Sequence, residues 1–169
     1  MQRLFIATWP PPELVETLHG LPRKDRPSIR WVQPEHWHVT LRFLGDADPD
    51  EVIGRLDQFE FAPTDVRFGP GIDVLHERVI MLPVHGLDEL AAAVSRHTAD
   101  LGSEQPRKRF VGHLTLARLR GQGRIPDVIG APVARTQRVE EITLVASTLR
   151  REGPVYEAIG SWAAGISSR

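Results

Sequence analysis

The tetrapeptide His-x-Thr-Leu occurs twice in the chain, beginning at His38 and again at His113, so the copies are 75 positions apart. Each copy lies in a strand-like run flanked by a helix-like segment. Two copies favour two related α/β lobes over a solenoid, which needs at least three repeats to be stable. We therefore predict that residues 1–169 form a single compact domain made of two pseudo-symmetric lobes.

The hydrophobic pattern divides the chain into short strands and helices. We expect strands over 4–8, 36–44, 66–74, 79–84, 110–119 and 141–149, with a short extended piece at 29–32 and a loop at 121–132. Gly45-Asp46 should end the second strand. Helices are expected after the prolines at 10–12, from Asp48 as N-cap to about 59, and over 88–101 with Gly102 behind the last turn.

Composition is that of an ordinary globular protein, with 41% hydrophobic and 25% charged residues among 169. Cysteine is absent, which excludes disulfides, thiolate metal sites and a cysteine nucleophile. The apolar run at 4–7 is too short for a signal peptide or a membrane span, so we expect a cytoplasmic protein without membrane partners. The net charge of −1 argues against coating of nucleic acid through many phosphate contacts.

The two motifs carry side chains suited to acid–base chemistry. Alternation along a strand points His38 and Thr40 the same way, and likewise His113 and Thr115. Near neutral pH one imidazole can accept a proton while the other donates one, and hydroxyls can donate to phosphate oxygens. If the two strands lie side by side, this set predicts in-line displacement at a cyclic phosphodiester, whose ring strain makes a metal unnecessary.

One segment around the second motif is basic. Residues 105–124 contain no Asp or Glu, and their cations are Arg107, Lys108, Arg109, Arg118, Arg120 and Arg124. Such a stretch is usually a solvated surface. Its position around His113 also favours a local site for an anion.

The other histidines and the tryptophans have no partner motif. His36 and His38 form a His-x-His pair, but no cysteine and no evident third ligand accompany it, so we predict neither a metal nor a cofactor. We expect the tryptophans in the core or on a cleft wall, and the remaining histidines on the surface. These are Trp9, Trp31, Trp37 and Trp162, and His19, His76, His85 and His97.

The chain resembles the 2H phosphoesterase superfamily, and within it the RNA 2′,3′-cyclic phosphodiesterases, also called 2′-5′ RNA ligases. The resemblance covers nearly the whole chain. It is carried by Arg3-Leu-Phe-Ile-Ala, Trp37-His-Val-Thr-Leu-Arg-Phe-Leu-Gly, Gly112-His-Leu-Thr-Leu-Ala-Arg, and Ala146-Ser-Thr-Leu with Tyr156. It implies a bilobal α+β fold, in which two antiparallel sheets face a central cleft and the helices lie outside.

The resemblance also suggests roles for two residues that each follow a motif histidine by five positions. From their positions, Phe43 would contact the base and Arg118 the phosphate. Thr40 and Thr115 would donate hydrogen bonds to the same phosphate. Strict alternation puts position five on the face opposite the histidine, so these roles require a bulge or a strand end, and Phe43 could instead be a core aromatic. Many members have proline where this chain has Gly112, which suggests a looser backbone there.

The expected reaction is hydrolysis of RNA 2′,3′-cyclic phosphate ends to 2′-phosphomonoesters, with weak reversible 2′-5′ ligation. RNA ends or small cyclic nucleotides are the expected partners, and the expected state is a monomer. In the expected mechanism, His113 is the base and His38 the acid, although the reverse assignment stays open. The alternatives are a nucleotide-binding module and a phosphodiesterase for another small cyclic nucleotide, such as ADP-ribose cyclic phosphate.

Overall fold

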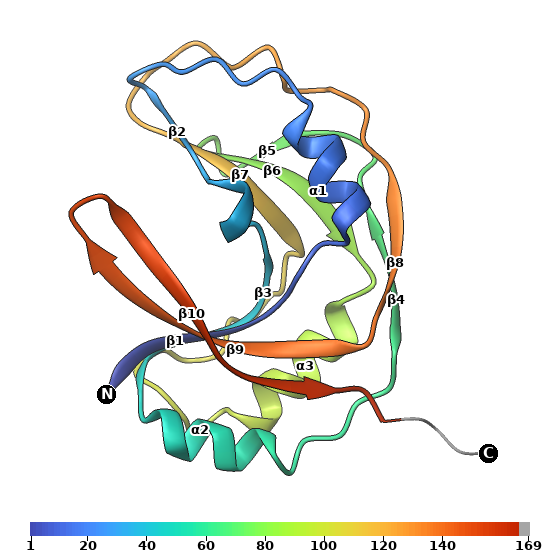
Figure 1. The fold of residues 1–169 in the computed structure, drawn as a ribbon, viewed down its shortest axis with the longest axis vertical. Helices are drawn as coiled ribbons and strands as arrows, with labels where there is room; N and C mark the ends of the chain where they lie inside the picture. Colours follow the sequence, from blue (N-terminus) through green and yellow to red (C-terminus); the bar gives the residue numbers. More distant parts are fainter. Residues whose placement is uncertain (166–169) are drawn as a thin grey trace.

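Antiparallel strands dominate the computed structural model, which describes residues 1–165 (Figure 1). The described strands are β1 (Gln2–Thr8), β2 (Ile29–Trp31), β3 (Val39–Ala47), β4 (Thr64–Phe68), β5 (Asp73–Leu75), β6 (Val79–His85), β7 (His113–Leu119), β8 (Arg135–Val139), β9 (Glu141–Arg150) and β10 (Gly153–Ala163). They join in the order β10-β9-β1-β3-β7-β6-β4-β8, while β2 pairs with β7 and β5 with β6.

This path consists of two half-sheets that meet at one point. The first half-sheet is β10-β9-β1-β3 and the second is β7-β6-β4-β8. Their junction is the pair of Val39 in β3 with Leu114 in β7, and both side chains are fully buried. Because Val39 follows His38 and Leu114 follows His113, the junction brings the two motifs together. The predicted class, an antiparallel α+β fold with helices outside, is confirmed.

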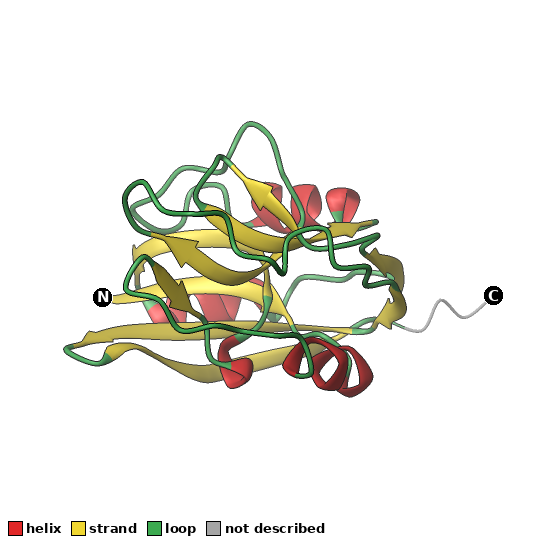
Figure 2. Cartoon of the chain, turned by 90° about the horizontal axis from the view of Figure 1, so that it is seen from above, coloured by secondary structure: helices red, strands yellow, loops and turns green. Residues whose placement is uncertain are grey.

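Three α-helices and a short 3₁₀ helix cover the strands in the described chain. In Figure 2 helices flank the strand layers above and below. Each α-helix buries one apolar stripe in the main core, as amphipathic spacing dictates. The helices are α1 (Pro12–His19), η1 (Pro34–His36), α2 (Pro49–Leu56) and α3 (Asp88–His97). None of those formed by residues 1–165 combines the length and apolar composition that a membrane crossing requires.

A second, smaller apolar cluster lies apart from the main core. Phe5, Ala7 and Val145 are its buried members, whereas Leu4 and Ile6 of the same strand belong to the main core. Strand β1 is therefore apolar on both faces, as its continuous run of apolar residues indicates. Three partly buried aromatic residues complete the small cluster: Trp9, Phe43 and Tyr156.

Several predicted boundaries are confirmed and others are wrong. The Asp48 side chain accepts from the backbone N–H of Asp50 at 3.0 Å, which confirms the N-cap of α2, although that helix ends at Leu56. The expected strand at 36–44 begins only at Val39, because residues 34–36 form η1. It also continues past Gly45 to Ala47, because β1 pairs with it as far as Ala47.

Three further differences concern where individual strands and helices begin, end or are interrupted. The expected strand at 66–74 is interrupted after Phe68 by the Gly69-Pro70 turn, and helix α3 ends at His97 rather than at 101. The last expected strand but one begins at His113 instead of 110. Strands β8 and β10 were not predicted, because β8 carries mainly exposed polar side chains and β10 is exposed along much of its length.

Candidate active site

The Val39–Leu114 pair sets the arrangement of the four motif side chains. Extending this antiparallel register by one residue places His38 opposite Thr115 and Thr40 opposite His113. All four then lie on the face opposite the buried Val39 and Leu114. The structure thus brings the two predicted histidine–threonine pairs to one location between the half-sheets.

Both catalytic candidates have their ring held in the same way. Nδ1 of His38 donates to the carbonyl of His36 at 2.7 Å, and Nδ1 of His113 donates to the carbonyl of Val111 at 2.7 Å. A carbonyl only accepts, so each bond puts the proton of the neutral ring on Nδ1 and leaves Nε2 as the proton acceptor. At His38 the Thr40 hydroxyl lies 3.1 Å from Nε2 and donates to it when the ring is neutral.

A bulge in β3 brings Phe43 to the histidine face. Ala7 of β1 pairs with Thr40 and Phe5 pairs with Phe43, so four positions of β3 lie opposite three of β1, with Leu41 in the extra place. Paired residues share a face, and Ala7 and Phe5 share one by alternation. Phe43 therefore lies on the same face as Thr40, as its predicted role requires, while it also packs in the small apolar cluster.

The second motif contains a bulge at the equivalent position. Met81 of β6 pairs with Thr115 while Val79 pairs with Arg118, so the register skips Leu116. Arg118 is therefore on the face of Thr115 and His113, and its side chain is exposed there. In both motifs the bulge falls at the leucine of His-x-Thr-Leu, which explains how position five reaches the site.

Aromatic rings enclose His38. Its ring lies 4.8 Å from that of Phe5, 5.6 Å from Tyr156 and 6.2 Å from Trp9, as centroid distances. The sequence does not predict this enclosure, because it places Trp9 only in the core or on a cleft wall and marks Tyr156 only through the family resemblance. Apolar residues on both faces of β1 were the available signal for Phe5. By contrast, His113 is half-buried, and no ring of residues 1–165 packs against it as these three do against His38.

Burial is the main influence on both rings. It lowers the pKa of His38; the bond to the His36 carbonyl opposes this, and the charges of His113, His36 and Arg118 lower the pKa further. Burial likewise lowers the pKa of His113; the Val111 carbonyl opposes this, and Arg107, Arg118 and His76 add to the lowering. The influence of His113 on the pKa of His38 is consistent with their shared location.

These shifts predict the pH dependence of catalysis. The reactive form has one neutral and one protonated ring, and both pKa values lie below the usual imidazole value of about 6.5. The pH profile of kcat/KM for a 2′,3′-cyclic nucleotide should therefore be bell-shaped, with its alkaline limb below about pH 6.5. A bound phosphate anion raises the pKa of the acid, so kcat should persist to higher pH. Initial rates across the pH range test this, and a flat profile would refute two-histidine catalysis.

Other predicted positions have plain structural explanations. Trp37 is buried, and His19, His76 and His85 are exposed as expected. His97 is not a simple surface residue, because it is half-buried and its Nε2 bonds the backbone carbonyl of Arg55 at 2.8 Å.

Gly112 is held close to β6 rather than loosely. A Cβ at this position would lie 2.3 Å from the carbonyl oxygen of Val84. The N–H of Val84 in turn donates to the Gly112 carbonyl at 3.0 Å. The suggested looser backbone before His113 is therefore not what the packing shows.

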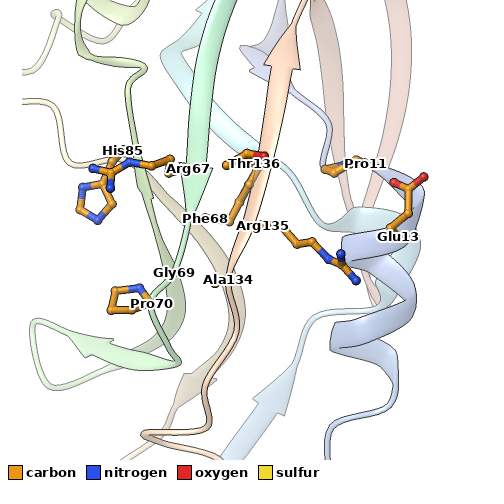
Figure 3. A pocket seen from close by; sticks show the side chains of 10 residues that line it. All are labelled: Pro11, Glu13, Arg67, Phe68, Gly69, Pro70, His85, Ala134, Arg135 and Thr136. Carbon is orange, nitrogen blue, oxygen red and sulfur yellow. The ribbon is translucent and has the colours of Figure 1, made fainter.

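Within residues 1–165, no group of three His, Asp or Glu side chains could hold a metal ion. A separate pocket of about 650 Å³ lies between α1 and the β4–β8 pair (Figure 3). Glu13, Arg67, His85 and Arg135 are among its lining residues, and none of the motif residues is. This pocket is distinct from the histidine site.

The fold and the paired motifs define a two-histidine phosphoesterase of the 2H type. Residues 9–69 match the model of the LigT like Phosphoesterase family. An RNA 2′,3′-cyclic phosphodiesterase of Aquifex aeolicus is 31% identical over 150 residues, 77% of this chain and 79% of the relative. Another from Thermus thermophilus is 31% identical over 177 residues, 93% of this chain and 87% of the relative.

A solved structure agrees with the sequence relatives. E. coli LigT complexed with 3′-AMP matches with a TM-score of 0.77 and 26% identity, over 96% of this chain and 98% of that one. The chain belongs to the LigT-like phosphoesterase family of the 2H superfamily, together with these RNA 2′,3′-cyclic phosphodiesterases.

Proposed function

We propose that this protein is an RNA 2′,3′-cyclic phosphodiesterase that opens cyclic phosphate ends to 2′-phosphomonoesters. The observation that carries the proposal is the pair of histidines with Nδ1 tied to a backbone carbonyl, which leaves two Nε2 atoms on one face with two threonine hydroxyls. The similarity to RNA 2′,3′-cyclic phosphodiesterases over most of the chain supports RNA ends as the substrate.

In the proposed reaction His113 is the base and His38 the acid. Nε2 of neutral His113 takes a proton from water as the water oxygen attacks phosphorus. The bond from phosphorus to the 3′ oxygen breaks, and protonated His38 delivers its Nε2 proton to that oxygen. Thr40, Thr115 and Arg118 stabilise the charge on the phosphate oxygens. If a 5′ hydroxyl of RNA replaces water, the same step forms a 2′-5′ linkage, so ligation is a weak variant of hydrolysis.

The proposal extends to the organisation and setting of the protein. We take the two half-sheets to be pseudo-symmetric lobes of one compact domain, because they carry matching motifs, histidine contacts and bulges. We place the enzyme in the cytoplasm as a monomer that needs no metal or cofactor. Absence of cysteine from the whole sequence fits a reducing compartment.

Incubation of the purified protein with 2′,3′-cyclic AMP and with RNA carrying a cyclic phosphate end, in EDTA, tests the proposal. We expect turnover of both to the 2′-phosphate product, unchanged by the chelator. Activity that EDTA abolishes and zinc or manganese restores would contradict the metal-free mechanism. Binding of nucleotides without turnover would favour the nucleotide-binding module. A higher kcat/KM for ADP-ribose cyclic phosphate, assayed alongside, would favour a phosphodiesterase for another small cyclic nucleotide.

Arg118 should be sensitive to conservative replacement. Its guanidinium can bind two phosphate oxygens at once, which a lysine ammonium cannot, so both Arg118→Lys and Arg118→Ala should lower kcat/KM about 10-fold or more. Steady-state kinetics on 2′,3′-cyclic AMP measure the loss. As a matched control, Arg124→Ala removes a charge from the same basic stretch and should change kcat/KM less than about twofold. Wild-type kinetics for both Arg118 variants would make this arginine a surface charge.

A further inference from the structure

Two arginines lie directly opposite one another beside the candidate site. Arg30 of β2 pairs with Arg118 of β7, and both side chains are exposed. Paired Cα atoms in antiparallel strands are about 4.5–5.5 Å apart, and like charges placed opposite each other are destabilising. No ion pair found among residues 1–165 includes either arginine. The described chain therefore builds a double positive charge here without compensating it.

Arg30 also reaches from the second half-sheet to the first. A Cβ at Gly153, where the β9–β10 hairpin turns, would lie 2.8 Å from a terminal nitrogen of Arg30. The Arg30 guanidinium thus lies against the turn of the hairpin, three residues before Tyr156, whose ring packs against His38. Consistently, burial raises the pKa of Tyr156 while the charges of Arg118, Arg3 and Arg30 oppose the rise.

The charge of the substrate distinguishes the roles of the two arginines. A 2′,3′-cyclic phosphate carries one negative charge, and Arg118 on the face of His113 and Thr115 suffices to balance it. Arg30 is on the neighbouring strand, along the same edge of β7 that β3 joins at Leu114. It is therefore placed for a second anion next to the reacting one. In a nucleoside with a cyclic phosphate on its 2′ and 3′ oxygens, the next position for a phosphate is the 5′ oxygen.

We propose that Arg30 binds a phosphate on the 5′ oxygen of the nucleoside whose cyclic phosphate is opened. The inference rests on the proposed function and specifies its substrate class: nucleotides with a 5′ phosphate ester over bare cyclic nucleosides. Two sources share this chemistry, namely the diester link to the preceding nucleotide of an RNA chain and a free 5′ phosphate on a mononucleotide.

Three substrates resolve the question: adenosine 2′,3′-cyclic phosphate, the same compound with a 5′ phosphate, and the dinucleotide ApA ending in a cyclic phosphate. We expect Arg30→Gln to lower kcat/KM about 10-fold for the two that carry a 5′ phosphate and less than about twofold for the first. Arg96→Gln, an exposed change on α3 with the same loss of charge, should affect none of them. Comparison of the two sensitive substrates identifies which source Arg30 favours.

Equal losses on all three substrates, or no loss on any, would overturn the role of Arg30. Failure of the proposed function has a different signature, because the wild-type protein would then open none of the three. A binding measurement remains decisive in that case. By isothermal titration, Arg30→Gln should weaken adenosine 2′,5′-bisphosphate about 10-fold and leave adenosine 2′-phosphate unchanged. Identical affinities of the variant and the wild type for the bisphosphate would refute the site.

Discussion

Alanine at His38 or at His113 should lower kcat/KM for a 2′,3′-cyclic phosphate about 10²–10⁴-fold, because each substitution removes one of the two proposed proton carriers. The double variant should lose less than the product of the two single losses, since groups that act as a unit are not additive. His85→Ala is the matched control, because that imidazole is exposed in the separate pocket of Figure 3.

The test has a clear contrary outcome. Both variants should keep the unfolding midpoint close to that of the wild type, since neither ring belongs to the fully buried core. If a folded His38→Ala or His113→Ala protein turns over at nearly the wild-type rate, with contaminating phosphodiesterase excluded, the paired motif is not the catalytic centre. If both variants lose activity as expected, the limb of the pH profile that is missing from the residual activity of each one identifies the base and the acid.

Arg42→Met should be the most destabilising single change outside the apolar core, at about 2–4 kcal/mol. The Arg42 side chain is only 4% exposed. Its terminal nitrogens donate to the backbone carbonyls of Phe43 and Glu104, both at 2.6 Å, and of Leu101 at 3.3 Å. Methionine matches the length of the stem but leaves these buried carbonyls without their donor. Urea unfolding of the variant and the wild type measures the difference.

Arg138→Ala provides the comparison for Arg42. Arg138 bonds Asp65 at 3.0 Å, but that pair is exposed, so its loss should cost less than about 1 kcal/mol. Equal midpoints for Arg42→Met and the wild type would mean that the segment at 101–104 does not need the arginine to hold it against β3. Activity per folded molecule should survive in both variants, since neither side chain touches the histidines.

The sequence was sufficient to propose the chemistry, because the signal for the two histidine–threonine pairs is local. Alternation within a strand put His38 with Thr40 and His113 with Thr115, and the repeat indicated two related lobes, which the β3–β7 junction brings together. The enclosure of His38 could not be predicted in the same way, because Phe5 and Tyr156 come from strands at opposite ends of the chain. Their approach depends on the β1–β9–β10 pairing, which no short pattern encodes.

The positions of Phe43 and Arg118 show a different limit. A bulge adds one residue to a strand without a distinctive composition, so alternation alone gave the wrong face. Two consecutive buried residues, Leu41 with Arg42 and Leu116 with Ala117, are its mark in the structure.

The end of α3 also depends on contacts that the local sequence does not encode. Helix α3 ends at His97, where Arg55 donates to the His97 carbonyl and the His97 ring donates to the Arg55 carbonyl.

The pairing of Val39 with Leu114 bears on the regiochemistry of the product. An antiparallel pair has a local two-fold axis, and rotation about it exchanges His38 with His113 and Thr40 with Thr115. The four motif side chains alone therefore treat the 2′ and 3′ oxygens of a bound ribose as equivalent leaving groups. Groups that do not obey this symmetry distinguish the two oxygens: the rings of Phe5, Trp9 and Tyr156 around His38, and the Arg30–Arg118 pair on β2 and β7. We therefore expect the choice between a 2′- and a 3′-phosphate to depend on how the nucleoside binds against these groups.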